Sequence, residues 1–385
     1  MIERVISKRW FVFLVTVVLY GLYTRGRPVV SLDGVHYVDL SNGFLSADFS
    51  GTFTAAALRW TKTLYLLILA LARVTTPHHW PIVMVAFNVV CSGLLAVMLV
   101  DIAKRSTRSA LAALAALLLY LGCYESLQWM PFIVTDPMFG AVAFVPFALV
   151  ARRILDPHEP ARPLLLTVAV AIAVFTRPPG VVLIPLVLFV ELVLVQKCVR
   201  PRSATIFIVA AALAAVFVRT AIVYQPALWP TRFVKPKIEE FSGREKKGEV
   251  VYDLKESYRP PPRTPIDHVV IEADRLVRFF QFTTPRYSRA HQLLNSIYFV
   301  PLYALALIGL VTGLRADPRR RAFVIALAMW IGIFALFQAL TVLDYDWRFR
   351  LPVLPQCILL AACGFDAIIV WWRERPSRVL GAASV

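Results

Sequence analysis

The sequence predicts an all-α polytopic membrane protein that forms a single transmembrane domain over residues 1–385. Hydrophobic residues make up 59% of the chain and charged residues only 17%. Apolar runs close to the roughly 20 residues that a helix needs to cross a bilayer recur along the whole length. Basic residues outnumber acidic ones by 41 to 24, and many of them cluster between the runs, where they orient membrane helices.

Ten apolar runs are predicted to span the membrane. They cover residues 10–24, 82–101, 109–123, 137–151, 163–175, 179–196, 204–223, 293–314, 322–342 and 351–372. The first run follows basic residues as a signal peptide does, but it lacks an A-x-A-like cleavage site, which favours an uncleaved span. An eleventh stretch, 64–74, is short and is flanked by Lys62 and Arg73.

The basic residues decide how the stretch 64–74 lies. If the N-terminus is cytoplasmic and this stretch lies along the membrane, each of the six inward-facing segments carries three or four basic residues. If 64–74 crossed, most of these segments would face outward, against the usual bias. We therefore expect about 10 transmembrane helices with both termini inside, together with surface-lying helices in the outer loops.

This topology brings the polar segments between spans to one outer face. The first outer loop covers 25–80, and a long outer loop covers 224–292. In the long loop, apolar residues recur at helical spacing from Ile266 to Phe280, with charged residues between them. The pattern predicts an amphipathic helix on the membrane surface, although a loop that only caps the bundle would have a similar composition.

The first outer loop contains the sequence SLDGVHYVDL, with Asp33, His36 and Tyr37 as candidate site residues. Asp33 and Tyr37 share one face of a short helix because they are four residues apart. A carboxylate above the membrane rim can act as general base towards an incoming hydroxyl. Aspartate is also a favoured capping residue, so Asp33 could equally cap that helix.

Two further outer segments hold candidate residues. Asp136 stands directly before the fourth span and is followed by Pro137, which suits a capping role, a substrate-facing role or both. Arg177 lies in the turn TRPPG between two close spans. Basic residues are usually found on the cytoplasmic side of membrane helices. We therefore expect the outward-facing Arg177 to pair with an anion, which could be Asp136, Asp33 or a phosphate.

The segment LDYDWRFRLPVLP, residues 343–355, precedes the last span and carries Asp344, Asp346, Arg348 and Arg350. The arginines are two apart, so they point the same way if the chain is extended there. Two guanidinium groups at a membrane surface suit a phosphate that stays attached to a lipid. Ordinary anchoring of a helix end at the interface is the alternative.

Several classes of site are not expected. There is no GxxxxGK[ST], HExxH or GxSxG motif and no soluble domain for a nucleotide sugar. The five cysteines form no CxxC pair, so we predict no disulfide framework, no metal and no cofactor. The net charge of +17 is explained by membrane topology, and without a zinc knuckle or an aromatic-basic platform no nucleic-acid partner is expected.

Together these segments resemble the integral-membrane glycosyltransferases of the GT-C fold, especially the bacterial protein mannosyltransferase and aminoarabinose transferase group. The resemblance rests on Asp33 with Tyr37, on Asp136 before a span, on the TRPPG turn, and on RFRLPVLP before the last span. One departure concerns Asp33, which Gly34 follows where many relatives carry an adjacent acidic pair. This departure makes a divalent metal less expected here.

The resemblance implies sugar transfer from a polyprenyl-phosphate donor to a hydroxyl of a lipid, glycan or protein acceptor. It implies that Asp33 is the catalytic base, that Asp136 helps position substrate, and that Arg348 and Arg350 lie near the donor phosphate. Membrane lipids are further expected partners. We expect transfer on the outer side of a bacterial plasma membrane, with inversion at the anomeric carbon.

Two alternatives remain open from the sequence. A transporter or flippase of lipid-linked saccharides would usually carry charged or helix-broken sites near the midplane of the membrane. The spans here are mostly aliphatic and the polar groups gather at one rim, which favours an enzyme. A polysaccharide polymerase or ligase would depend on arginines in 224–292 and would not depend on Asp33.

Overall fold

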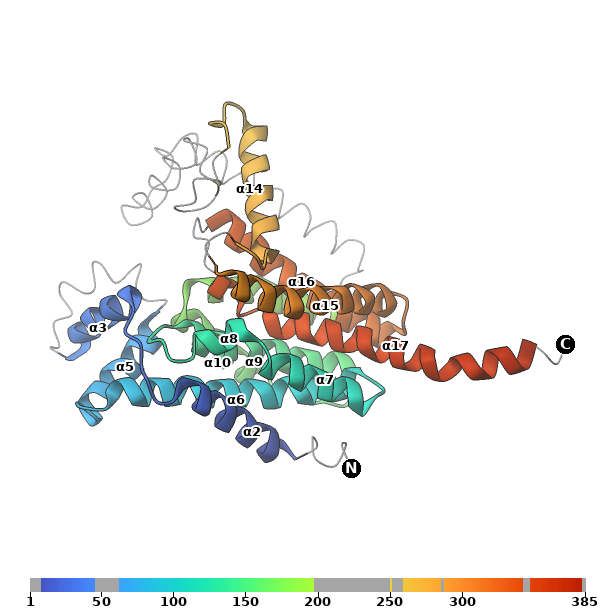
Figure 1. The fold of residues 1–385 in the computed structure, drawn as a ribbon, viewed down its shortest axis with the longest axis horizontal. Helices are drawn as coiled ribbons and strands as arrows, with labels where there is room; N and C mark the ends of the chain where they lie inside the picture. Colours follow the sequence, from blue (N-terminus) through green and yellow to red (C-terminus); the bar gives the residue numbers. More distant parts are fainter. Residues whose placement is uncertain are drawn as a thin grey trace.

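The computed structural model describes residues 8–45, 62–196, 250, 259–284, 287–341 and 347–382, and Figure 1 shows their arrangement. Within these ranges the protein is all-helical, apart from one isolated parallel bridge between Val29 and Phe132. The fold class predicted from the sequence is therefore confirmed as all-α.

Among the described residues, six helical segments are long and apolar enough to cross a membrane. They are α6 (Trp80–Ser106), α9 (Asp136–Leu155), the continuous run of η2 (Pro178–Val182), α11 (Leu183–Phe189) and η3 (Val190–Val195), α15 (Arg289–Leu314), α16 (Pro318–Thr341) and α17 (Leu354–Ala382). Four shorter apolar helices accompany them: α2 (Arg9–Thr24), α5 (Thr63–Thr75), α7 (Ala110–Leu121) and α10 (Pro163–Thr176). This content is that of a multi-pass membrane protein.

Each predicted span except 204–223 coincides with a helix, and 204–223 lies outside the described residues. The runs that became α2, α7 and α10 are shorter than a straight crossing requires, so the number of ten spans stays a prediction. The stretch expected to lie along the membrane is α5. Its 13 residues reach about 20 Å, which is less than the roughly 30 Å of a hydrocarbon core.

The helices α2, α6, α7, α15 and α17 run along the long axis of the molecule (Figure 1). The helix α3 (Leu32–Leu45) lies at one end of this bundle, and the C-terminus lies at the other. We call the first of these the α3 end. It also holds α8 (Tyr124–Gln128) and η6 (Trp347–Arg350), which contact each other.

Helices α15 and α17 make the most extensive contact in the described structure, and glycines allow their close approach. A methyl group on Gly309 would overlap the backbone carbonyl of Leu360, and one on Gly364 would overlap that of Leu305. Small residues at a crossing are how membrane helices bring their backbones together. At these two glycines the helices therefore pack backbone against backbone.

Polar side chains tie helices together at the end of the bundle opposite the α3 end. Asp366 on α17 accepts hydrogen bonds from the backbone N–H groups of Arg108 and Ser109, at 3.0 and 2.8 Å, just before α7 begins. Asp101 on α6 pairs with Arg152 at the end of α9, at 2.9 Å. Carboxylates at helix N-termini satisfy backbone donors that have no partner within the helix.

The predicted amphipathic helix of the long outer loop is α14 (Pro265–Phe280), which stands across the direction of the bundle helices (Figure 1). A capping box begins it, because Thr264 and Asp267 each bond the other's backbone N–H. Ile266, Val270 and Val277 are exposed along it. The helix is confirmed, its contact with a membrane surface stays a prediction, and most of the loop before residue 259 lies outside the described residues.

Candidate functional site

Three ion pairs between carboxylates and arginines gather the predicted site residues at the α3 end. They join Asp33 to Arg348, Asp136 to Arg177, and Glu125 to Arg350. Segments far apart in the sequence meet in these pairs, since 315 positions separate Asp33 from Arg348.

Asp33 lies in the first turn of α3, and its carboxylate contacts the last predicted segment. Arg348 Nη1 lies 2.5 Å from Asp33 Oδ2. The guanidinium also faces the rings of Trp129 and Phe349, with centroids at 5.5 and 5.4 Å. The Asp33 side chain is 44% exposed and that of Arg348 is 14% exposed. Of the two, the carboxylate is therefore the more accessible to an incoming molecule.

Asp33 does not cap its helix. The hydroxyl of Ser31, one residue before α3, accepts a hydrogen bond from the N–H of Gly34 at 3.3 Å, which is the usual work of an N-cap side chain. Ser31 therefore caps the helix, and the Asp33 carboxylate instead accepts a hydrogen bond from Arg348.

A short parallel bridge holds the start of the first loop against the segment before α9. Val29 donates to the carbonyl of Pro131 at 2.8 Å, and Ile133 donates to the carbonyl of Val29 at 3.0 Å. The approach is so close that a Cβ on Gly34 would lie 3.1 Å from the Ile133 carbonyl oxygen. This close approach gives a physical reason for glycine at position 34.

Tyr37 lies on the same face of α3 as Asp33, as predicted, and is buried. Its ring meets the edge of Tyr65 at 5.5 Å between centroids, and Lys62 Nζ lies 4.9 Å from its ring centroid. Burial raises the pKa of its phenol, while the nearby guanidinium of Arg177 opposes that shift. His36 is exposed on α3, so the geometry brings Tyr37, and not His36, towards the arginines.

Asp136 and Arg177 form a buried pair. Asp136 is 1% exposed and Arg177 is 8% exposed. Asp136 is the first residue of α9 and Arg177 follows α10, so the pair ties the ends of two helices together. Arg177 also faces the ring of Phe349 at 4.9 Å. Asp136, one of the three anions expected for Arg177, is in contact with it.

The extended conformation expected for Arg348 and Arg350 is wrong, because residues 347–350 form a 3₁₀ turn. The two guanidinium groups bond different acids and make no paired fork. Arg350 Nε donates to Glu125 Oε2 at 2.7 Å, and Nη1 donates to the carbonyl of Gln281 at 2.7 Å. Asp344 and Asp346 lie outside the described residues.

Glu125 is the site residue that the sequence reasoning missed. Its side chain is fully buried, and that of Arg350 is 3% exposed. Arg350 also packs over the Phe299 ring, with its centroid 4.3 Å away. Burial alone would lower the pKa of the Arg350 guanidinium, but the Glu125 carboxylate outweighs it and the pKa is raised. The available signal was an acid within an aromatic outer segment, YESLQWM.

At the α3 end, as far as the structure describes it, the partly exposed carboxylate of Asp33 lies beside the guanidinium of Arg348, with aromatic rings and two buried ion pairs nearby. Asp33 can accept a proton, and Arg348 can bind an anion. Within the described ranges, no three side chains of histidine, cysteine, aspartate or glutamate group closely enough to hold a metal ion.

Comparison with protein-family models, with curated proteins and with solved structures found no match for this chain.

Proposed function

We propose that this protein is a GT-C-like glycosyltransferase that moves a sugar from a polyprenyl-phosphate donor to an acceptor hydroxyl. The contact between Asp33 and Arg348 is the observation that supports the proposal most strongly. It combines a proton acceptor and an anion-binding group, which are the two groups that such a transfer needs at the reacting centre. The proposed setting is the outer side of a bacterial plasma membrane.

In the proposed reaction, the acceptor oxygen attacks the anomeric carbon while Asp33 takes the hydroxyl proton. The bond between that carbon and the phosphate oxygen breaks, and the polyprenyl phosphate leaves with the bonding electrons. Arg348 stabilises the charge that develops on it. A phosphate is already a good leaving group, so no strong general acid is required. Attack opposite the departing phosphate inverts the anomeric carbon.

The ion pair also suggests an order of events. Without donor, Arg348 holds the Asp33 carboxylate. A donor phosphate competes for the same guanidinium and forms charge-assisted hydrogen bonds with it. Asp33 is then released to face the acceptor, so the base becomes available only when the donor is bound.

The other charged residues receive supporting roles in this proposal. Asp136 holds Arg177 and Glu125 holds Arg350, so both arginines are already engaged with buried carboxylates. We therefore assign the phosphate to Arg348 and assign Arg350 to fixing the 3₁₀ turn that carries it. Phe349 lies between Arg348 and Arg350 in the sequence, and its ring contacts Arg177 and Arg348.

The proposal is tested with Asp33→Asn in membranes supplied with a labelled polyprenyl-phosphate sugar. The amide cannot take the proton, so transfer is expected to fall by about 10²- to 10⁴-fold. Asp39→Asn is the matched control, because Asp39 is an exposed aspartate on the same helix. Unchanged transfer by Asp33→Asn would remove Asp33 from the mechanism. Flux of the lipid-linked sugar through the purified protein without covalent transfer would favour the transporter alternative.

A further inference from the structure

A groove between α10 and the α11–η3 segment lies away from the site at the α3 end. Its volume is about 710 Å³, and apolar side chains line most of it. Representative lining residues are Leu166, Val170, Val174, Ile184, Leu188 and Leu192. Arg177 follows α10 at the α3 end, whereas Arg162 precedes α10 at the other end. We call this cavity the α10 groove.

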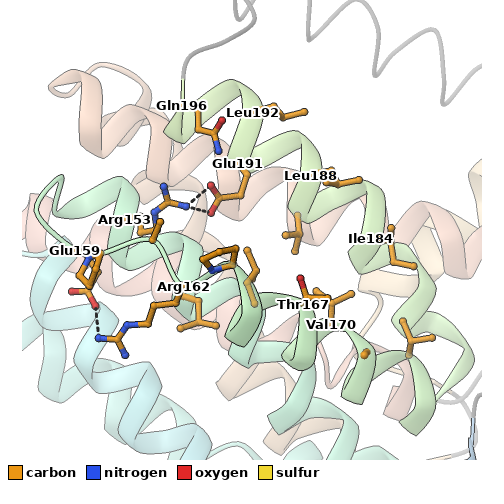
Figure 2. A pocket seen from close by; sticks show the side chains of 18 of the residues that line it. Arg153, Glu159, Arg162, Thr167, Val170, Ile184, Leu188, Glu191, Leu192 and Gln196 are labelled. Atoms are coloured by element: carbon orange, nitrogen blue, oxygen red, sulfur yellow. Dashed lines mark hydrogen bonds and ion pairs between the residues drawn. The ribbon is translucent and has the colours of Figure 1, made fainter.

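Charged side chains gather at the Arg162 end of the α10 groove, and Figure 2 shows them beside the aliphatic part. Arg153 donates to Glu191 at 2.6 Å, and both are largely buried. Arg162 lies 3.8 Å from Glu159, and its side chain is 52% exposed. The first pair is tight, and the second is loose enough for a ligand to separate its members.

Glu191 belongs to an unusual stretch of helix. Residues 190–195 form a π-helical turn within an otherwise apolar candidate span. Such turns are rare and are frequently found at functional sites. A charged residue within a membrane span is costly unless it is paired, and it usually marks a binding site or pathway. These two observations indicate a ligand site at this end of the groove.

The outer surfaces of the flanking helices indicate that the groove opens to lipid. Leu164 and Val168 on α10 and Leu188 and Leu192 on the facing segment are exposed and apolar. With 14 residues, α10 reaches about 21 Å, less than the roughly 30 Å of a hydrocarbon core. The charged residues that precede α10 mark the end of its apolar run, and this is the level at which lipid headgroups are expected to meet the acyl chains.

The balance of charge at this end specifies the headgroup. Among the residues that the structure describes here, Arg153 and Arg162 line the groove together with Glu159 and Glu191, and these four side chains carry no net charge. Arg105, which pairs with Glu159 at 3.5 Å, also pairs with Asp101 at 3.4 Å and with Asp156 at 3.9 Å. An anionic headgroup would need an excess of positive charge, whereas a zwitterionic headgroup matches an arginine beside a carboxylate.

We propose that the α10 groove binds a zwitterionic, amine-bearing phospholipid of the phosphatidylethanolamine class. One acyl chain lies along the aliphatic part between α10 and α11. The phosphate binds the guanidinium of Arg162, and the ammonium binds the carboxylate of Glu159. The tight pair of Arg153 and Glu191 stays closed and forms the polar floor of the headgroup site.

The test measures lipid retention by the purified full-length protein. The protein is reconstituted into phosphatidylcholine nanodiscs with equal small amounts of phosphatidylethanolamine and phosphatidylglycerol, released into detergent, and analysed by native mass spectrometry. The wild type is expected to retain phosphatidylethanolamine about tenfold over phosphatidylglycerol, as expected for one charge-assisted hydrogen bond.

Two variants and one control locate the lipid. Ala171→Trp fills the groove and is expected to abolish retention, while the double variant Glu159→Gln with Arg162→Gln is expected to abolish the headgroup preference. Val168→Trp is the matched control, because Val168 is an exposed residue of α10 outside the lining of the groove. Its retention should equal that of the wild type.

Three results would overturn the proposal. Equal retention of the two phospholipids by the wild type would remove the zwitterion preference, and this readout needs no variant. Unchanged retention by Ala171→Trp would place the lipid elsewhere. Light scattering that shows two copies of the chain, with Ala171→Trp separating them, would make a second copy the occupant.

Discussion

At the residue scale, three carboxylates at the α3 end differ in how deeply they are buried. Asp33 remains reachable, whereas Asp136 and Glu125 are buried against arginines. Removing one partner of a buried ion pair leaves an uncompensated charge, which costs far more than the pair contributes. The two buried pairs are therefore expected to matter for stability, and the Asp33–Arg348 pair for activity.

Glu125→Ala is predicted to destabilise the protein by about 3–5 kcal/mol, because it leaves Arg350 buried without its carboxylate. The double variant Glu125→Leu with Arg350→Met removes both charges and is expected to recover much of that loss. The measurement is the thermal unfolding midpoint in detergent. A midpoint for Glu125→Ala equal to that of the wild type would contradict the burial of this pair.

The residue scale is also where sequence reasoning was weakest. The predicted topology places the segments of the candidate residues on one face, and the structure brings Asp33, Tyr37, Asp136, Arg177, Arg348 and Arg350 to the α3 end, whereas His36 is exposed. Their pairing could not be predicted, since it depends on a 3₁₀ turn that directs Arg348 and Arg350 to different acids. Glu125 was missed because no motif distinguishes a buried acid from an exposed one in an outer segment.

At the scale of elements, backbone contact between α15 and α17 fixes the core of the bundle. Gly309→Leu or Gly364→Leu places a side chain against a carbonyl of the facing helix. Overpacking of this kind costs about 1–3 kcal/mol in ordinary cores, and more is expected where the neighbour is backbone. Thermal unfolding checks it, with Gly332→Leu on α16 as control because a Cβ there meets no neighbouring atom within 4 Å. Equal midpoints for all three variants would contradict the close crossing.

The N-terminus of α14 is predicted to depend on pH through its capping box. Hydrogen bonds from the backbone N–H groups of Arg263 and Thr264 lower the pKa of the Asp267 carboxyl. A lowered folded-state pKa means that the stabilisation is fully present above the ordinary value and is lost as pH falls through the lowered one.

A spin label on Val270→Cys, in a chain without its other cysteines, reports this loss as increased mobility on acidification. Asp267→Asn should be as mobile at neutral pH as the wild type is in acid. Mobility that is the same in both chains at every pH would contradict the capping box.

At the scale of the whole molecule, the apolar runs predicted the helices well because a bilayer imposes length and hydropathy on each span. Every predicted span within the described residues is a helix, although only six helical segments are long enough for a straight crossing. The helices α2, α7 and α10 end within two residues of the predicted runs 10–24, 109–123 and 163–175, so these runs were already shorter than a straight crossing requires. The α10 groove could not be predicted, because it arises between two helices whose separate sequences are simply aliphatic.

The two proposed sites lie in different parts of the molecule. The α3 end carries the pair proposed for sugar transfer, and the opposite end of α10 carries the pair proposed for a phospholipid headgroup. A loss of lipid retention in Ala171→Trp with normal sugar transfer would show that the two sites work independently.

The proposed function requires that the first outer loop and the segment before the last span meet on the non-cytoplasmic face. The most direct measurement uses Asp33→Cys with Arg348→Cys in a chain without its other cysteines, in sealed right-side-out vesicles. A short, membrane-impermeant bifunctional thiol reagent is added outside, and the long loop is then cleaved by protease. The two fragments are predicted to stay joined. Reaction of the two cysteines from opposite sides of the membrane, or reaction of both without joining, would contradict the account.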